Sequence, residues 1–173
     1  MNQLTEIIQE ATAAIQAGYF HLQIDGGDPI YRERVYCYEL YHQMRLRWPD
    51  ATDFCLNGEI DKSAHPILRE LGADHVKPDL LVHRPGYMLG NYAVIEVKSS
   101  ESRLQGIKKD LQNLALFRGV VGYERAIYLM YGYEVDQSIE RILRVAGAFT
   151  NLPTIELWLH KAPGQPAIHN LTL

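Results

Sequence analysis

The chain has 173 residues and a formal net charge of −4, and 47% of its residues are hydrophobic. This length fits one domain, and the apolar content is enough for a packed core, which excludes a disordered tail. The acidic balance argues against a protein that binds nucleic acid through bulk charge alone, so a nucleic-acid surface would have to be local or completed by a homodimer or a partner protein.

Targeting signals and a disulfide framework are not expected. No apolar run approaches the roughly 20 residues of a membrane span, and the N-terminal residues lack the basic start and apolar stretch of a signal peptide. The two cysteines, Cys37 and Cys55, do not make a disulfide framework, and buried free thiols are the expected state of both. We therefore expect a protein of the reducing cytoplasm with no membrane partner.

Hydrophobic periodicity and turn residues predict helices and strands along the whole chain. In the break at residues 26–29, Asp28 is placed as the N-cap and Pro29 as the first residue of a second helix, which should end before Pro49. Gly58 suggests a bend within the first strand, and the tail after Pro163 is expected to be irregular. Helices are expected at residues 3–17, 29–47, 103–118 and 136–148, a short helix or irregular connection at 65–71, and strands at 53–61, 76–83, 92–98, 125–133 and 154–160.

This order of elements predicts an α/β fold. Three sequential strands suit an antiparallel meander, and the helix after Lys98 suits a crossover to a parallel strand, which should be central in the sheet. We expect a mixed β-sheet with helices on its faces, in one domain over residues 1–173. An N-terminal helix at 3–17 and a helix–strand extension at 136–160 would be additions to its central part.

Two short segments carry the chemistry. Pro78-Asp79 and Glu96-Val97-Lys98 lie in strand-like apolar runs, and strand alternation places Glu96 and Lys98 on one face. Asp79 can face them from the adjacent strand. Carboxylates are suitable Mg²⁺ ligands, the Val97 backbone carbonyl can add a third oxygen, and Lys98 can orient or deprotonate a water or stabilise charge on a phosphate. The alternative is a surface salt bridge between Glu96 and Lys98, which a strand buried on both faces disfavours.

These segments resemble the PD-(D/E)xK nuclease superfamily over about residues 31–133. The resemblance implies a restriction-endonuclease-like αβββαβ core flanked by helices, and metal-dependent phosphodiester cleavage with Mg²⁺, or Mn²⁺ as a substitute. Many members carry a glutamate on the helix before the first strand, and Glu39 matches that position in order and context. An exposed acid on an amphipathic helix is the alternative reading of Glu39.

Other polar residues are candidates for substrate contacts. His42 shares a helical face with Glu39 and His83 shares a strand face with Asp79, although structural histidines are the alternative for both. Lys108 and Lys109 could contact a nucleic-acid backbone or simply form a solvated helix face. Gln112 resembles a glutamine of some superfamily exonucleases, but Leu116 stands where their signature has a tyrosine, so exonuclease action is unsupported.

The sequence thus predicts a metal-dependent nuclease, with DNA as the expected substrate. Asp79 and Glu96 are the expected metal ligands, Glu39 completes the site, and Lys98 acts on the water. The alternative is a non-catalytic nucleic-acid-binding or regulatory subunit that retains the nuclease fold. The negative net charge favours this alternative. The complete set of two acids and a lysine in apolar strands disfavours it, because buried charges without partners are costly and a non-catalytic subunit has no reason to retain them.

Overall fold

The computed structural model describes residues 3–60 and 66–173. Its helices are α1 (Leu4–Ala13), α2 (Ala17–Phe20), α3 (Glu33–Leu46), α4 (Pro66–Glu70), α5 (Leu104–Leu116) and α6 (Ser138–Ala146), and a π-helical segment, Phe117–Val121, extends α5. Its strands are β1 (Leu22–Ile24), β2 (Gly27–Ile30), β3 (Cys55–Gly58), β4 (Leu80–His83), β5 (Asn91–Ser99), β6 (Arg125–Tyr131), β7 (Glu156–His160) and β8 (Ile168–Thr172).

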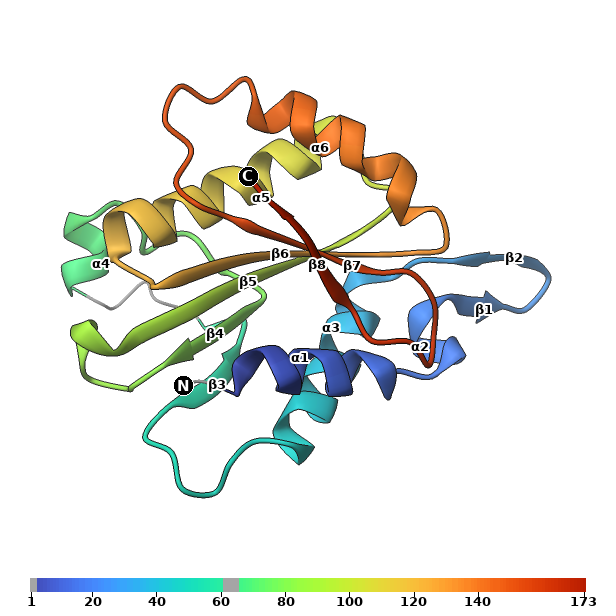
Figure 1. The fold of residues 1–173 in the computed structure, drawn as a ribbon, viewed down its shortest axis with the longest axis horizontal. Coiled ribbons are helices and arrows are strands. Elements are labelled where there is room, and N and C mark those ends of the chain that lie inside the picture. Colours follow the sequence, from blue (N-terminus) through green and yellow to red (C-terminus); the bar gives the residue numbers. More distant parts are fainter. Residues whose placement is uncertain (1–2, 61–65) are drawn as a thin grey trace.

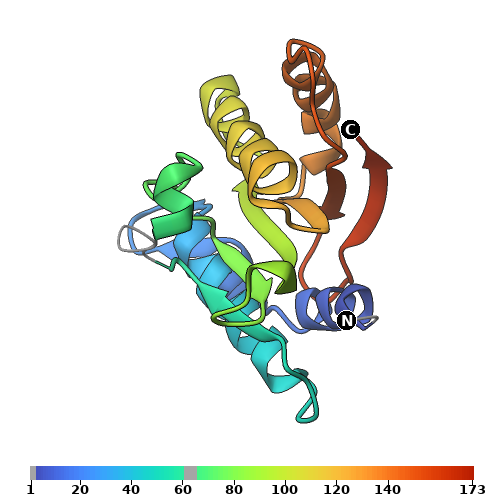
Figure 2. The ribbon, with the colours of Figure 1, turned by 90° about the vertical axis from the view of Figure 1, so that its left-hand side faces the viewer.

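These elements form a mixed α/β fold in three layers. A six-stranded sheet with the order β3-β4-β5-β6-β7-β8 lies between α1 and α3 on one face and α5 and α6 on the other (Figure 1). The view along the sheet in Figure 2 shows the same separation of the two helix layers. A short hairpin of β1 and β2 stands outside the sheet.

The strand directions confirm the expected topology. β3, β4 and β5 form an antiparallel meander, α5 then crosses to β6, and β6 runs parallel to both β5 and β7. The register pairs Leu80 of β4 with Ile95 of β5, and Glu96 of β5 with Tyr128 of β6. This register brings the beginning of β4 next to the second half of β5.

Burial on both faces explains why β5 and β6 are so apolar. Ile95 and Val97 pack into the core under α1 and α3, whereas Val94 packs into the core under α5 and α6. A charged residue in the second half of β5 is therefore surrounded by protein rather than by solvent. The interpretation of β5 as a strand buried on both faces is confirmed.

Two sequence-based expectations were wrong. Asp28 and Pro29 lie in β2 rather than at the start of a helix, because Asp25-Gly26, with Gly26 at φ 73°, makes the two-residue turn of a β-hairpin, and α3 begins only at Glu33. The tail is also not irregular, since β8 pairs antiparallel with β7 and adds an edge strand. Two expected elements reach beyond the described part of the chain, the strand at residue 61 and the helical connection at residue 65.

Both cysteines are free thiols, and they differ in burial. Cys37 and Cys55 are free; Cys37 is buried and Cys55 partly buried. Burial, followed by the nearby carboxylates, raises the pKa of the Cys37 thiol well above its usual value. In the described ranges, no helix is long and apolar enough to cross a membrane.

His160, at the end of β7, should make the protein sensitive to acid. Its ring is fully buried, its Nδ1 shares a 2.7 Å hydrogen bond with the Tyr36 hydroxyl, and burial lowers its pKa to about 4. The unfolded chain protonates this ring near pH 6.5, so its stabilising contribution is complete above that pH and is lost as the pH falls towards 4. We expect a loss of roughly 3 kcal/mol from this group.

Urea unfolding between pH 7.5 and pH 4.5 measures this contribution. His160→Gln should fall less steeply in stability with acid than the wild type, whereas His75→Gln, at an exposed histidine, should follow the wild type. Equal slopes for His160→Gln and the wild type would contradict the assignment.

Candidate active site

The candidate site lies where the beginning of β4 meets the second half of β5. Asp79 directly precedes β4, and its Oδ2 accepts a 2.7 Å hydrogen bond from the backbone N–H of Val97. The aspartate side chain thus takes the place of a main-chain partner at this position. The bond fixes the Asp79 carboxylate against β5, next to the side chain of Glu96.

Asp79, which is partly buried, and Glu96, which is buried, form a carboxylate pair. Glu96 is only 4% exposed, and its Oε1 accepts a 3.0 Å hydrogen bond from Asn113 Nδ2 on α5. Burial is the main cause that raises the pKa of Glu96 well above its usual value, and the charges of Asp79 and Asp110 raise it further. Burial also raises the pKa of Asp79, although the Val97 N–H opposes this. Two acids in this state are stabilised by a shared proton or a cation.

The Val97 carbonyl is directed towards the same place. In a β-strand, the N–H and C=O of one residue point to the same neighbouring strand. Because the Val97 N–H donates to Asp79, its C=O also faces the Asp79 side of β5. Two carboxylates and one backbone carbonyl therefore converge on one side of the strand.

Lys98 is held between two acids on opposite sides of the sheet. Its Nζ lies 3.0 Å from Glu33 Oε2 on α3 and 3.0 Å from Asp110 Oδ2 on α5. Burial would lower the pKa of Lys98, but the two carboxylates outweigh it and raise the pKa above its usual value. For Asp110 burial is the larger effect and raises the pKa to about 6. The positive charge of Lys98 opposes that rise. Lys98 is therefore a fixed cation at neutral pH.

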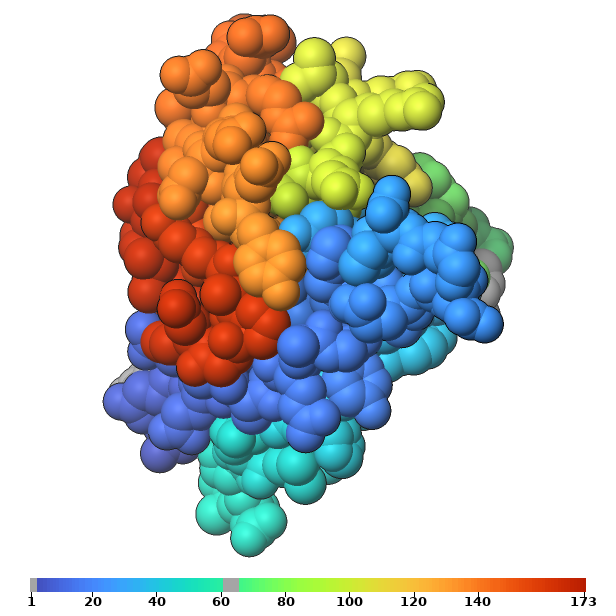
Figure 3. Space-filling view, turned by 90° about the vertical axis from the view of Figure 1, so that its right-hand side faces the viewer, coloured from blue at the N-terminus to red at the C-terminus, as the bar shows by residue number. Residues whose placement is uncertain are grey.

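Glu33 connects α3 to the loop between β5 and α5. Its Oε1 accepts hydrogen bonds from the Ser99 backbone N–H at 3.3 Å and from the Ser102 hydroxyl at 3.1 Å. Glu33 is in the first turn of α3, where a carboxylate is favoured by the helix dipole. Figure 3 shows the resulting surface, with the start of α5 in yellow-green beside the light-blue segment that leads into α3.

The structure brings Asp79, Glu96, Val97 and Lys98 together as the sequence predicts. It brings Glu33, rather than Glu39, to Lys98. Glu39 lies six residues further along α3, about 9 Å by the helical rise, and accepts a 2.7 Å hydrogen bond from Gln43.

The predicted substrate contacts lie at various distances from this centre. His42 is exposed on α3, and His83 is at the far end of β4, where its Nε2 shares a 2.9 Å hydrogen bond with Asn57 Oδ1. Lys108, Lys109 and Gln112 are exposed on α5 and line a hollow of about 730 Å³ that reaches Ser102. Ser102 donates a hydrogen bond to Glu33, so this hollow borders the site. His83, in contrast, lies away from the site.

Sequence reasoning missed Glu33, Asp110 and Asn113. Asp110 had a readable signal, because it falls on the buried stripe of α5 formed by Ile107, Leu111 and Leu114, where an acid needs a partner. Glu33 lay within the expected helix at residues 29–47, but nothing in the sequence indicated that the first turn of this helix faces Lys98. Asn113 gave no comparable signal, since one partly buried amide beside an apolar stripe is common.

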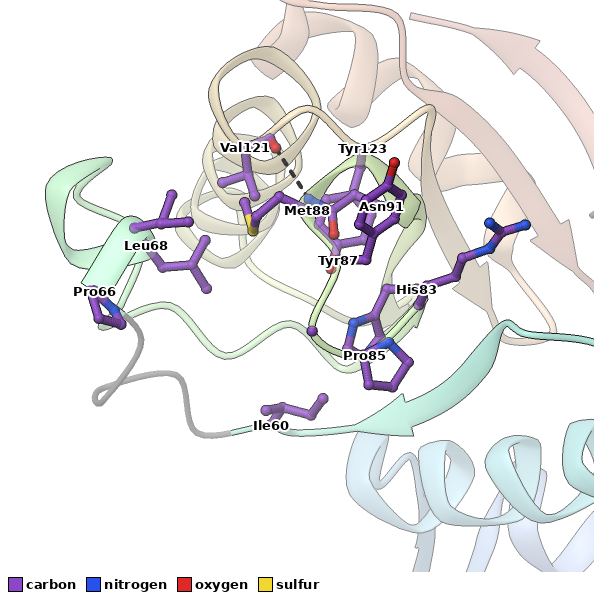
Figure 4. A pocket seen from close by; sticks show the side chains of 13 residues that line it. Ile60, Pro66, Leu68, His83, Pro85, Tyr87, Met88, Asn91, Val121 and Tyr123 are labelled. Carbon is purple, nitrogen blue, oxygen red and sulfur yellow. Dashed lines mark hydrogen bonds between the residues drawn. The ribbon is translucent and has the colours of Figure 1, made fainter.

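A second hollow lies at the opposite end of β5, between α4 and the loop that joins β4 to β5 (Figure 4). It has a volume of about 490 Å³, and Asn91 Nδ2 donates a 3.3 Å hydrogen bond to the Val121 carbonyl at its wall. None of its described lining residues is acidic. It therefore does not offer the carboxylate chemistry of the Asp79 end.

The donor set of the site fits a hard divalent ion. Within residues 3–60 and 66–173, no three His, Cys, Asp or Glu side chains gather closely enough to hold a metal by themselves. Magnesium commonly uses only one or two carboxylates and completes its shell with waters and substrate phosphate. Asp79, Glu96 and the Val97 carbonyl supply such a partial set, and burial, the main cause of the raised pKa values of the two acids, leaves little water to solvate their charges.

Comparison with known proteins does not identify a relative. The chain matches no protein-family model, no curated protein and no solved structure. Its function therefore has to be argued from the site.

Proposed function

We propose that this chain is a magnesium-dependent nuclease that hydrolyses phosphodiester bonds, with DNA as its expected substrate and Mn²⁺ as a substitute metal. One observation carries the proposal: the buried Glu96 carboxylate and the partly buried Asp79 carboxylate lie near a lysine that is fixed as a cation. Apart from the short helix α4 between β3 and β4, the order α3-β3-β4-β5-α5-β6 agrees with the αβββαβ core of the PD-(D/E)xK superfamily. In this proposal, α1 and the α6-β7-β8 segment are additions to that core.

The residues have distinct roles in the proposed reaction. Asp79, Glu96 and the Val97 carbonyl would hold the ion, which lowers the pKa of a bound water and withdraws charge from a phosphate. The raised pKa of Lys98 favours electrostatic stabilisation of the phosphate and orientation of the water over proton abstraction. Glu33 and Asp110 keep the lysine charged and fix its position.

A nuclease screen tests the proposal. Purified protein should cleave at least one of single-stranded DNA, duplex DNA, branched DNA or RNA in the presence of Mg²⁺ or Mn²⁺, and EDTA should stop the reaction. Folded Asp79→Asn protein should be inactive on the same substrate. Absence of cleavage on all four substrates, together with absence of metal binding, would refute the proposal.

A matched pair of variants decides which glutamate of α3 belongs to the site. Glu33→Gln should lower the cleavage rate at least tenfold, because the neutral amide no longer holds Lys98 by charge. Glu39→Gln should stay close to the wild type if only its contact with Gln43 is changed. The opposite result, a large loss in Glu39→Gln alone, would support the glutamate that sequence order suggested.

The alternative is a non-catalytic nucleic-acid-binding or regulatory subunit. Metal-independent binding of nucleic acid without cleavage would support it. The free cysteines are compatible with the proposed reducing cytoplasm. A homodimer or a partner protein remains part of the proposal for duplex substrates, since cutting both strands requires two sites.

A further inference from the structure

A separate pocket opens beside Asp79, on the α3 side of the sheet. It has a volume of about 440 Å³, within the range of small-molecule sites. Its walls include Tyr38 and Tyr41 of α3, Gly58 and Glu59 at the end of β3, and Asp79 itself. A ligand in this pocket would therefore lie against one of the proposed metal ligands.

The α3 wall of the pocket is aromatic. Tyr38 and Tyr41 are three residues apart on one helical face, and Tyr38 is 61% exposed although it is a large ring. Tyr41 is partly buried, and its hydroxyl donates a 3.5 Å hydrogen bond to the Leu56 carbonyl. The Tyr41 ring is therefore held in place, whereas the Tyr38 ring is exposed. A flat ligand could stack on such an exposed ring.

The opposite wall is acidic and conformationally strained. Glu59 has φ 41° and is the only non-glycine residue with positive φ in the described ranges. Its N–H donates a 3.1 Å hydrogen bond to the Asp79 carbonyl, and its carboxylate lies 3.4 Å from Arg34 Nε in an exposed pair. Backbone strain of this kind gathers at functional sites. Here the strained residue is held against the main chain of Asp79, and both residues line the pocket.

The charge of the pocket lining indicates which class of ligand the pocket would bind. The lining includes two acidic residues, Glu59 and Asp79, whose negative charge disfavours a phosphate or another anion, whereas carboxylate oxygens accept hydrogen bonds from amino groups. A carboxylate is a suitable partner for the exocyclic amine of cytosine, and adenine also presents an amine. Thymine and uracil present carbonyl oxygens in the corresponding position and would face the carboxylates unfavourably.

We propose that the pocket between Tyr38 and Glu59 binds an unpaired, amino-bearing nucleobase next to the scissile phosphate. The inference rests on the proposed function, because it places that phosphate at Asp79 and Glu96. A base inside a duplex has its faces stacked and its edge paired, so a base in this pocket has to be unpaired. The preferred substrate is therefore single-stranded nucleic acid, or an unpaired region, with cytosine or adenine at this position.

Binding without metal tests the pocket separately from cleavage. Labelled single-stranded oligomers of dC, dA and dT and a duplex of equal length would be titrated in EDTA. The wild type should bind dC and dA oligomers more tightly than dT oligomers and the duplex. Tyr38→Ala should weaken binding of the dC oligomer by roughly 5- to 100-fold, the value of one lost base–aromatic stack, and Tyr38→Phe should retain it.

Two further variants complete the test. Glu59→Gln should reduce the preference for dC and dA over dT, and Tyr87→Ala, which removes a similarly exposed tyrosine at the other end of the sheet, should bind like the wild type. Metal-dependent cleavage combined with equal binding by Tyr38→Ala and the wild type would overturn the pocket and leave the nuclease proposal standing. Base-selective binding without cleavage on any substrate would support the pocket and overturn the nuclease proposal.

Discussion

Replacing Lys98 with methionine should abolish cleavage and also lower the free energy of unfolding by roughly 3 kcal/mol at pH 8, as for other buried pairs that lose one partner. The reason is the position of the lysine between Glu33 and Asp110, at 3.0 Å from each. Without it, two acids remain close together with no counter-charge. Urea unfolding and the cleavage assay measure the two effects on the same preparation.

A double variant separates the structural and chemical roles of this lysine. Adding Asp110→Asn to Lys98→Met removes one of the orphaned charges and should recover a large part of the lost stability. It should not recover cleavage, because no cation remains near the phosphate. A double variant that is both stable and active would show that Lys98 only balances the charge of its neighbours.

Neutralising either member of the carboxylate pair should also have a large effect on activity. Asp79→Asn and Glu96→Gln should each lower the cleavage rate by about 100-fold or more, comparable to the loss of a major electrostatic group in other enzymes. Both substitutions keep the shape and an acceptor oxygen for Val97 N–H or Asn113. Normal unfolding curves together with lost cleavage would therefore locate the defect in the chemistry.

The same variants should change how stability depends on pH. The pKa values of Asp79 and Glu96 are raised by burial, so the native state binds more protons than the unfolded chain. The contribution of these two acids to the stability of the metal-free protein should therefore fall as the pH rises through the native pKa values, opposite in sign to the contribution of His160. Glu96→Gln should reduce this fall between pH 5 and pH 8. If the slope of the unfolding free energy against pH were the same in Glu96→Gln and the wild type, Glu96 would not be the group that titrates.

Magnesium should offset the charge of the pair. At about ten times its dissociation constant, a ligand specific for the native state adds roughly 1.4 kcal/mol, which corresponds to a rise in Tm of about 3–6 °C for a domain of this size. The rise should be present in the wild type and absent from Asp79→Asn. An equal rise in both proteins would show that the metal binds elsewhere.

The sheet and most of its topology could be predicted because they depend on local patterns. The apolar run around Val94 and Ile95 identified a strand buried on both faces, and the helix after Lys98 required a parallel crossover. The β1–β2 hairpin was missed because Pro29 was weighed above the Asp25-Gly26 turn signal. β8 was missed because its residues are mostly exposed, so it shows little of the apolar pattern of a core strand.

The candidate site was predictable only where its residues lie on the same strand or on neighbouring strands. Strand alternation and neighbouring strands placed Asp79, Glu96 and Lys98 together. Glu33 and Asp110 come to Lys98 from α3 and α5, on opposite faces of the sheet. Which turn of a helix faces a given strand depends on tertiary packing, so the sequence order that favoured Glu39 could not indicate that Glu33 is the glutamate that contacts Lys98.

The position of the metal can be measured directly. Crystals grown with Mn²⁺ should give one anomalous-scattering peak beside β5, in contact with the carboxylates of Asp79 and Glu96 and the carbonyl oxygen of Val97. Crystals of Asp79→Asn grown in the same way should lack it. A peak that persists in the variant, or a wild-type protein that cleaves with Mn²⁺ while its metal lies away from these residues, would contradict the proposed site.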